Sequence, residues 1–205
     1  HQPEEITLQE LLEGCKEDKS MYASASERLL MAIGDPVTVD TRNDERLSRI
    51  FTNRKIKVYP KFGDFYGMED TIQQVVSFLK HAAQSLEEEN QILYLLGPVG
   101  GGKSSVAERL KELMQDIPIY ALKAFNPKKD DWEISPLFES PLGLFNGAED
   151  GEAMLEEYGI QARYLKYIMS PWAVKRMEEA EGDLTKFKVV KIWPDILKQI
   201  AITKV

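Results

Sequence analysis

The chain is poor in the residues that hold small proteins together through covalent or metal crosslinks. Its 205 residues include one cysteine, Cys15, and two histidines, His1 and His81. A single cysteine excludes an intrachain disulfide and fits a reducing compartment such as the cytoplasm. No Cys/His spacing of the kind that binds zinc is present. We therefore expect neither a disulfide framework nor a zinc fold.

Long apolar runs and an excess of positive charge are also lacking. Unbroken apolar runs such as Ile92 to Leu96 are only five residues long, against the roughly 20 residues that a membrane helix needs. No signal peptide is visible. The net charge of −8 produces a diffuse negative field that repels phosphate backbones. We therefore expect no membrane partner and no nucleic-acid partner.

The chain does contain helical and strand patterns in the order typical of an α/β protein. Glu69 to Ala83 has the spacing of an amphipathic helix. Ile92 to Leu96 is consistent with a buried strand, and after a glycine-rich turn a second helix is expected from about Lys103 to Gln115. Ile117 to Leu122 is a further strand candidate. This order predicts a parallel sheet flanked by helices, with a right-handed crossover.

The N-terminal third is expected to be a small helical subdomain followed by a connector. Residues 6–34 have helical patterns, with capping-box pairs at Thr7 and Glu10 and at Ser24 and Glu27. Residues 35–64 are mixed and charged, which favours a solvated connector; a contact with phosphate or with a partner is the alternative. Six basic residues of this stretch cluster against few acidic ones: Arg42, Arg46, Arg49, Arg54, Lys55 and Lys57. We place the helical N-terminal segment and connector at residues 1–60 and the core domain at 61–205.

The C-terminal part begins with a long segment from Asn126 to Asn146 that has little periodicity, which is typical of a functional or disordered loop. Three short helical patterns follow: one ends at Gly159, one carries Tyr164, Leu165 and Ile168, and one opens at Ser170 with Pro171 in the first helical position. Phe187 to Ile192 is a strand candidate, and Pro194 opens a last helix.

One motif carries chemistry. Residues 97–104 match G-x-x-x-x-G-K-[ST], the P-loop or Walker A pattern, without a gap. The glycines allow a close approach of the backbone to phosphate, and the amide groups form an anion-binding nest. We expect Lys103 to reach the β- and γ-phosphates of ATP in the catalytic role, and Ser104 to be the Mg²⁺ ligand. The predicted nucleotide-binding residues here are Gly97, Pro98, Val99, Gly100, Gly101, Gly102, Lys103, Ser104 and Ser105.

A second segment lies about 30 residues upstream and reads Phe65-Tyr66-Gly67-Met68-Glu69-Asp70. By itself this pattern favours a plain turn at the start of a helix. Placed before a strand and a P-loop, it is similar to the segment of AAA+ ATPases that packs against adenine. We call residues 65–70 the adenine-side segment and predict that Tyr66, Gly67 and Met68 contact the base.

Other nucleotide motifs are absent from these 205 residues. No run of four apolar residues ends in Asp-Glu, and Val189 to Asp195 is only a poor candidate because Lys191 and Pro194 interrupt it. His-Arg-Asp and Asp-Phe-Gly, the usual protein-kinase signatures, are also missing. The residues alone therefore argue for nucleotide binding and not for efficient hydrolysis or transfer.

Several stretches closely resemble the bacterial PrkA-type serine protein kinases. They are Glu27 to Gly34, Phe65 to Glu69, Leu93 to Ser105, Ile168 to Ala173 and Lys188 to Pro194. The resemblance implies an AAA-type ATPase domain that uses ATP and Mg²⁺. It also implies phosphorylation of serine or threonine on a protein substrate, a cytoplasmic location and a link to stress responses. Because members are much longer, we expect this chain to be the N-terminal part of the ATPase domain.

Two further functions remain open. An AAA+ ATPase that remodels or helps to degrade proteins would use the same P-loop, and so would a non-catalytic nucleotide sensor. AAA+ domains commonly form rings, so two states stay open for this chain, a homo-oligomer and a monomer. Only the resemblance favours the kinase among these functions.

Overall fold

The computed structural model describes residues 2–52, 54–84, 103–166 and 168–194. The chain divides into two compact units, residues 24–114 and residues 1–23 with 115–205. Each unit is described by itself. The predicted domain boundary at residue 60 stays a prediction.

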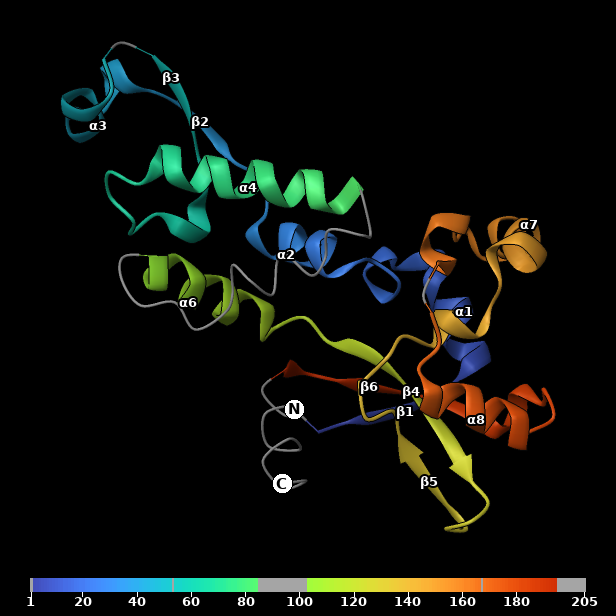
Figure 1. Cartoon of the computed structure of the whole chain (residues 1–205). Helices are drawn as coiled ribbons and strands as arrows, with labels where there is room; N and C mark the ends of the chain where they lie inside the picture. Colours follow the sequence, from blue (N-terminus) through green and yellow to red (C-terminus); the bar gives the residue numbers. More distant parts are fainter. Residues whose placement is uncertain (1, 53, 85–102, 167, 195–205) are drawn as a thin grey trace. The chain divides into compact units, whose positions relative to one another are not determined.

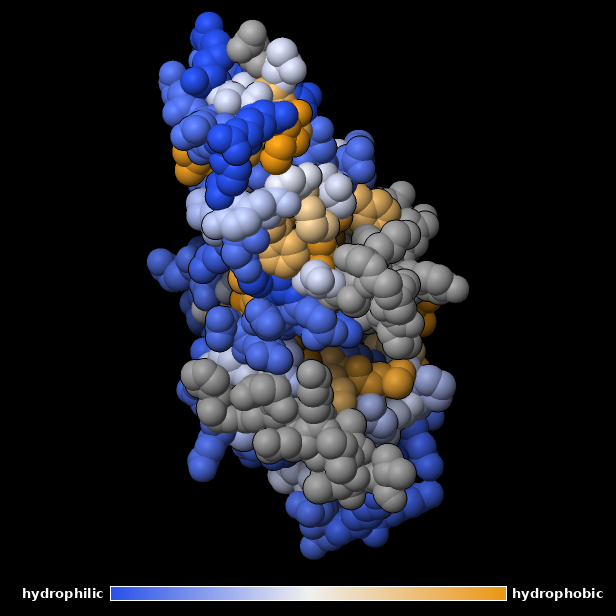
Figure 2. Space-filling model, turned by 90° about the vertical axis from the view of Figure 1, so that its left-hand side faces the viewer, coloured by the Kyte–Doolittle hydropathy of each residue, from blue (hydrophilic) through white to orange (hydrophobic). Residues whose placement is uncertain are grey.

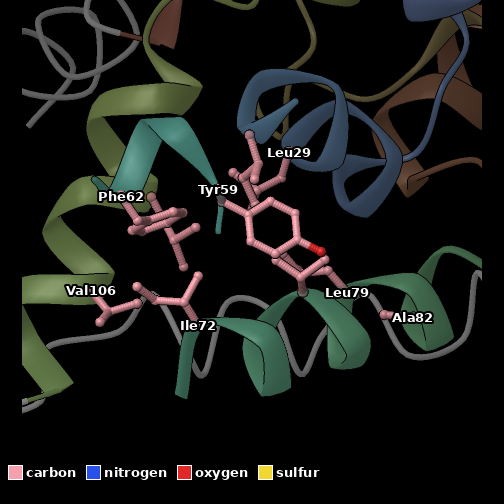
Figure 3. Close-up of a cluster of buried hydrophobic side chains, with 10 residues drawn as sticks. Leu29, Tyr59, Phe62, Ile72, Leu79, Ala82 and Val106 are labelled. Atoms are coloured by element: carbon pink, nitrogen blue, oxygen red, sulfur yellow. The ribbon is translucent and has the colours of Figure 1, made fainter. Parts of the chain in front are cut away.

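The unit of residues 24–114 is built on three helices, α2 (Ala25–Ile33), α4 (Glu69–Gln84) and α6 (Lys103–Met114). In Figure 1, α2 lies between α4 and α6, and it packs against both. Their shared core includes Leu29, Ile72, Leu79 and Val106, which Figure 3 shows facing one another. The predicted helices at 69–83 and 103–115 are thus confirmed to within one residue at each end.

The same unit carries a two-stranded antiparallel sheet, β2 (Val37–Asp40) and β3 (Lys55–Val58), and the short helix α3 (Glu45–Ile50). Leu47, Phe51 and Ile56 form a small core of their own. The expected solvated connector is therefore an ordered substructure. Figure 2 shows its outer surface, at the top of the view, as mostly hydrophilic.

The other unit is organised around a four-stranded sheet with the order β1 (Glu4–Thr7), β6 (Phe187–Ile192), β4 (Ile119–Asn126), β5 (Asp131–Ile134). All three strand pairings are antiparallel, for example Leu122 opposite Val189. The prediction of a parallel sheet is therefore wrong for the described strands, although the mixed α/β class holds. The expected strand Ile92–Leu96 lies outside the described residues.

Helices α1 (Leu8–Glu17), α7 (Gly147–Tyr158) and α8 (Pro171–Glu179) belong to this unit, and side chains of α1 and α7 share a core with Val189 of β6. The sequence predicts the capping residues at the ends of these helices. Thr7 and Glu10 form both bonds of a capping box, and Ser170 caps α8 ahead of Pro171. Gly159 ends α7 in the left-handed conformation. These predictions are confirmed.

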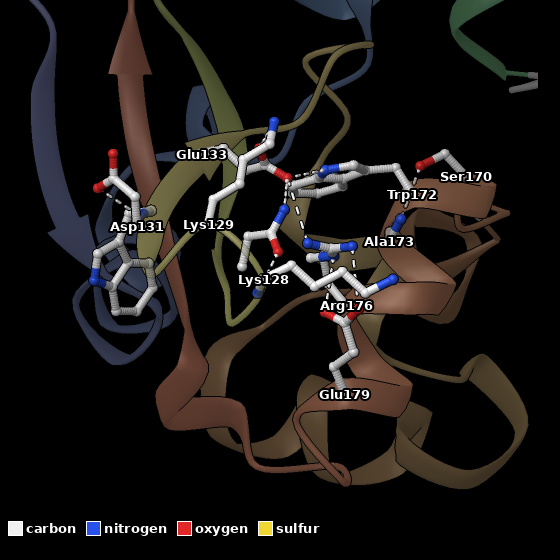
Figure 4. A network of polar contacts seen from close by, with 11 residues as sticks. Lys128, Lys129, Asp131, Glu133, Ser170, Trp172, Ala173, Arg176 and Glu179 are labelled. Atoms are coloured by element: carbon white, nitrogen blue, oxygen red, sulfur yellow. Dashed lines mark hydrogen bonds and ion pairs between the residues drawn. The ribbon is translucent and has the colours of Figure 1, made fainter.

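Two predictions about the C-terminal part need correction. The segment 126–146 is only partly irregular: residues 126–134 complete the hairpin of β4 and β5, and Pro141–Leu144 is a 3₁₀ turn. The pattern with Tyr164 and Leu165 gives only the 3₁₀ turn Ala162–Leu165. Figure 4 shows how Glu133 of β5 joins the hairpin to α8, by accepting a hydrogen bond from the Trp172 indole N–H. Within the hairpin, Glu133 also accepts a hydrogen bond from the Asn126 side-chain amide. The body of the helix expected after Pro194 lies outside the described residues.

Candidate nucleotide-binding site

The P-loop motif is in register with the start of α6. Gly97 to Gly102 lie outside the described residues, but Lys103 and Ser104 are the first two residues of the helix and Ser105 is the third, with an exposed side chain. A P-loop requires its lysine and serine at this position, where free amide groups and the helix dipole attract phosphate. The described backbone therefore places these residues where the motif needs them.

The first turn of α6 is also free of carboxylates. The first turns of α2, α4 and α7 carry acidic side chains, Glu27 in α2 and Glu69 and Asp70 in α4 among them. Acidic residues there satisfy the helix dipole from within the protein. Since α6 has none in its first turn, no negative side chain of that turn competes with an anionic ligand.

Core packing fixes the orientation of α6. Val106, Ala107 and Leu110 are buried, and Val106 and Leu110 belong to the core that α2 and α4 share. A helix that is anchored along one face holds its N-terminus in a defined place. The position of the predicted phosphate ligand therefore depends on this core.

The adenine-side segment is a tight turn that leads into α4. Gly67 has φ of +79°, which only glycine adopts without strain. Among the described residues, a Cβ there would meet the Ile50 side chain at 3.8 Å, which is an ordinary contact. The Met68 carbonyl accepts the Ile72 amide at 2.9 Å and so opens the helix, while the Met68 side chain packs on the core. Tyr66 is 60% exposed. A turn with an exposed ring and an open glycine can accept a flat aromatic ligand, although it is equally a helix-start turn.

Three arginines contact this turn and the residues before it: Arg46 of α3, Arg109 of α6, and Arg54, which lies just before β3. The Arg46 guanidinium of α3 lies 3.7 Å from the centre of the Tyr66 ring. Arg54 donates to both carboxylate oxygens of Asp70, at 3.0 and 2.8 Å. Arg46 and Arg54 belong to the basic cluster of the supposed connector, so the structure assigns to two of its members contacts within the chain.

The third arginine is Arg109 of α6, which sequence reasoning missed. Its two terminal nitrogens donate to the two oxygens of Asp64 at 2.7 and 2.6 Å, and one also donates to the Lys61 carbonyl at 2.6 Å. The guanidinium lies 4.9 Å from the centre of the Phe65 ring. These hydrogen bonds hold the pKa of the Asp64 carboxyl below its ordinary value. No local signal could have revealed the pair, because 45 residues separate Asp64 from Arg109.

The described residues hold no group of three or more His, Cys, Asp or Glu side chains arranged for a metal ion. Ser104 is the residue expected to ligate Mg²⁺, and its side chain lies outside the description. Within the described ranges, no helix is long and apolar enough to cross a membrane.

A mixed α/β protein with a phosphate-binding motif at the start of a helix is the class to which AAA ATPase domains belong. The chain belongs to the PrkA AAA domain family, whose model matches residues 6–205. The predicted relationship to PrkA-type proteins is thereby confirmed. No solved structure matches the chain.

Two kinds of curated relative carry different names. Over 201 residues the chain is 63% identical to "Serine/threonine kinase YeaG" of Escherichia coli (strain K12), covering 98% of this chain and 30% of the relative. Over 185 residues it is 28% identical to "ATP-dependent protease PrkA" of Bacillus subtilis (strain 168), covering 87% of this chain and 25% of the relative. The chain thus spans less than a third of the length of either relative.

Proposed function

We propose that this chain is the ATP-binding domain of a bacterial PrkA-type serine/threonine protein kinase, and that it binds Mg-ATP at the P-loop of residues 97–104. Membership of the PrkA AAA family supports the domain type. The name of the relative at 63% identity supports the kinase. The observation that carries the site is the register of the motif: α6 begins at Lys103, its first turn has no acidic residue, and a buried face anchors it.

In this proposal each residue has one task. The amides of residues 100–104 donate to the phosphate oxygens, and the Lys103 ammonium balances the charge of the β- and γ-phosphates. Ser104 ligates Mg²⁺, and Ser105 adds a phosphate contact at the first turn of α6. Tyr66, Gly67 and Met68 flank the base. Bound Mg-ATP supplies the activated γ-phosphoryl group, and a serine or threonine hydroxyl of a protein substrate accepts it.

The activity belongs to the full-length protein, because the residues known to support phosphoryl transfer in ordinary kinases have no counterpart among these 205. We expect residues 1–205 to bind nucleotide with weak transfer or none. The location is expected to be cytoplasmic, with a role in stress responses. A homo-oligomer is also expected, in view of the domain type.

The test is to incubate the full-length protein with labelled ATP and a protein substrate, beside its Lys103→Ala variant and residues 1–205. The proposal expects phosphoserine or phosphothreonine from the parent, loss of the label in Lys103→Ala, and ATP binding without strong transfer by residues 1–205. Tight ATP binding by the full-length parent without any turnover would replace the kinase with a nucleotide sensor.

A second candidate is an ATP-dependent protease or remodelling ATPase, which the name of the Bacillus subtilis relative favours. The two functions share the nucleotide site and differ in what the rest of the protein does with ATP. ATP-dependent assembly accompanied by unfolding or cleavage of a protein, without phosphoryl transfer, would favour this candidate.

A further inference from the structure

The residues just before the adenine-side segment are bound from two sides. Tyr59 and Phe62 are buried in the core of α2, α4 and α6. Pro60–Phe62 is a 3₁₀ turn that Tyr59 precedes and Gly63 follows. This apolar side sets the depth of residues 59–65. It leaves the Lys61 carbonyl and the Asp64 carboxylate free to bond with another element.

Arg109 binds both of these groups. Its fork of donors meets the Asp64 carboxylate in the two-bond geometry that gives arginine pairs their strength and direction. The further bond to the Lys61 carbonyl fixes the main chain, and the ring of Phe65 closes the contact. The Arg109 side chain is only 24% exposed, while that of Asp64 is 62% exposed. The pair is therefore partly shielded on the arginine side.

Arg109 lies on the same helix as the predicted phosphate ligands. Arg109 lies six residues after Lys103 on one continuous helix, a rise of about 9 Å. The helix that opens with the predicted phosphate ligands therefore also grips the residues that lead into the predicted base contacts.

We propose that Arg109 is a positioning residue that couples the adenine-side segment to the phosphate-binding helix, so that the base and the triphosphate are bound as one ligand. This inference rests on the proposed ATP site. Arg109 itself touches neither part of the nucleotide. Loss of Arg109 should therefore lower the affinity for ATP more than the affinity for a phosphate ligand that has no base. The predicted phosphate ligands stay on α6 whether or not Arg109 binds Asp64.

The test compares two ligands, Mg-ATP and inorganic tripolyphosphate with Mg²⁺, by calorimetric titration of the full-length protein. Arg109→Met removes the fork, and Arg109→Lys keeps the charge without the two-bond geometry. Lys111→Met is the matched control, because it removes one charge from the same helix and pairs only with Glu108 among its described ion pairs. Asp64→Asn tests the other partner.

We expect Arg109→Met to weaken ATP binding by about tenfold, the scale of a lost ordering contact, and to change tripolyphosphate binding by less than about twofold. Arg109→Lys and Asp64→Asn should show smaller losses that are again confined to ATP. Lys111→Met should bind both ligands like the parent.

Four results would overturn the inference. Unchanged ATP affinity in both Arg109→Met and Asp64→Asn would show that the contacts of Arg109 with Asp64 and Lys61 do not position the adenine-side segment. Equal losses for both ligands, or melting of both variants below the assay temperature, would assign Arg109 a general structural role. If the parent binds ATP no better than tripolyphosphate, the base contributes nothing to affinity, and Arg109 then has no base contact to position. A parent that binds neither ligand would instead refute the proposed ATP site itself.

Discussion

The two compact units order their irregular segments by different means. In the unit of residues 24–114, the segment 61–70 is held at the surface by arginines that pair with exposed carboxylates. In the other unit, the segment 135–140 is held from within by Glu139. This residue accepts bonds from the hydroxyls of Ser135 and Ser170, both at 2.6 Å, and from the Ser170 amide at 3.0 Å.

The two kinds of contact differ in the free-energy cost of removing them. Loss of a surface pair lets both partners return to water, which costs little free energy. Loss of an acceptor beside a fully buried hydroxyl leaves the O–H donor of that hydroxyl without an acceptor, which costs more. The first kind of contact can set the position of a segment without deciding whether the unit folds, and the second decides stability.

Glu139→Ala tests this difference with the largest expected effect. It deprives the buried Ser135 and the Ser170 cap of their acceptor, so we expect a loss of about 2–3 kcal/mol in the free energy of unfolding. Urea unfolding measures it, with Arg54→Ala as the surface control, for which the loss should stay below about 1 kcal/mol. Similar losses for the two variants would remove the distinction.

Alkaline pH should weaken the unit of residues 1–23 and 115–205. Burial, with a smaller contribution from Asp18, raises the pKa of the Cys15 thiol to about 12, and burial raises that of Tyr120 to about 12. Both groups are neutral when folded, so stability is full below the unfolded pKa values and falls as the pH rises toward 12. At pH 10 we expect a loss of about 2 kcal/mol relative to pH 8, most of it from Cys15.

Urea unfolding of the parent and of Cys15→Ala at the two pH values checks this prediction. The variant lacks the thiol, so its stability should depend less on pH between 8 and 10. An equal pH dependence in parent and variant would show that ionisation of Cys15 is not the cause.

The two capping boxes offer the finest comparison, because the same bonds occur in both units. Ser24 is 1% exposed and caps α2, whereas Thr7 is exposed and caps α1. We expect Ser24→Ala to cost about 1–2 kcal/mol and Thr7→Ala about 0.5–1 kcal/mol. Urea unfolding of the two variants measures the difference, and a larger cost at Thr7 would contradict it.

Local features of the fold were predictable from the sequence. The caps at Thr7, Ser24 and Ser170 and the helices α4 and α6 follow from residues close together in the chain. The sheet does not. β1 pairs with β6 through partners such as Glu5 and Val190, and no periodicity reports a pairing across such a distance. β5 is four residues with only two apolar side chains, too short a pattern to separate from a loop.

The candidate site shows the same division. The motif predicted that a helix starts at Lys103, and the glycine of the adenine-side segment predicted a turn, because both depend on local backbone chemistry. The contacts of Arg109 with Asp64 and Lys61 join residues that only the packing of α6 brings together. The ligand contacts of Gly97 to Ser105 and of Tyr66, Gly67 and Met68 stay predictions.

A calorimetric titration of Mg-ATP measures whether the P-loop binds ATP. The parent should bind, and Lys103→Ala should bind at least about tenfold more weakly with the fold intact, because it removes one charge-assisted phosphate contact. Lys111→Ala, which removes the same charge from the same helix, should bind like the parent. Equal ATP affinity in Lys103→Ala and the parent would contradict the account.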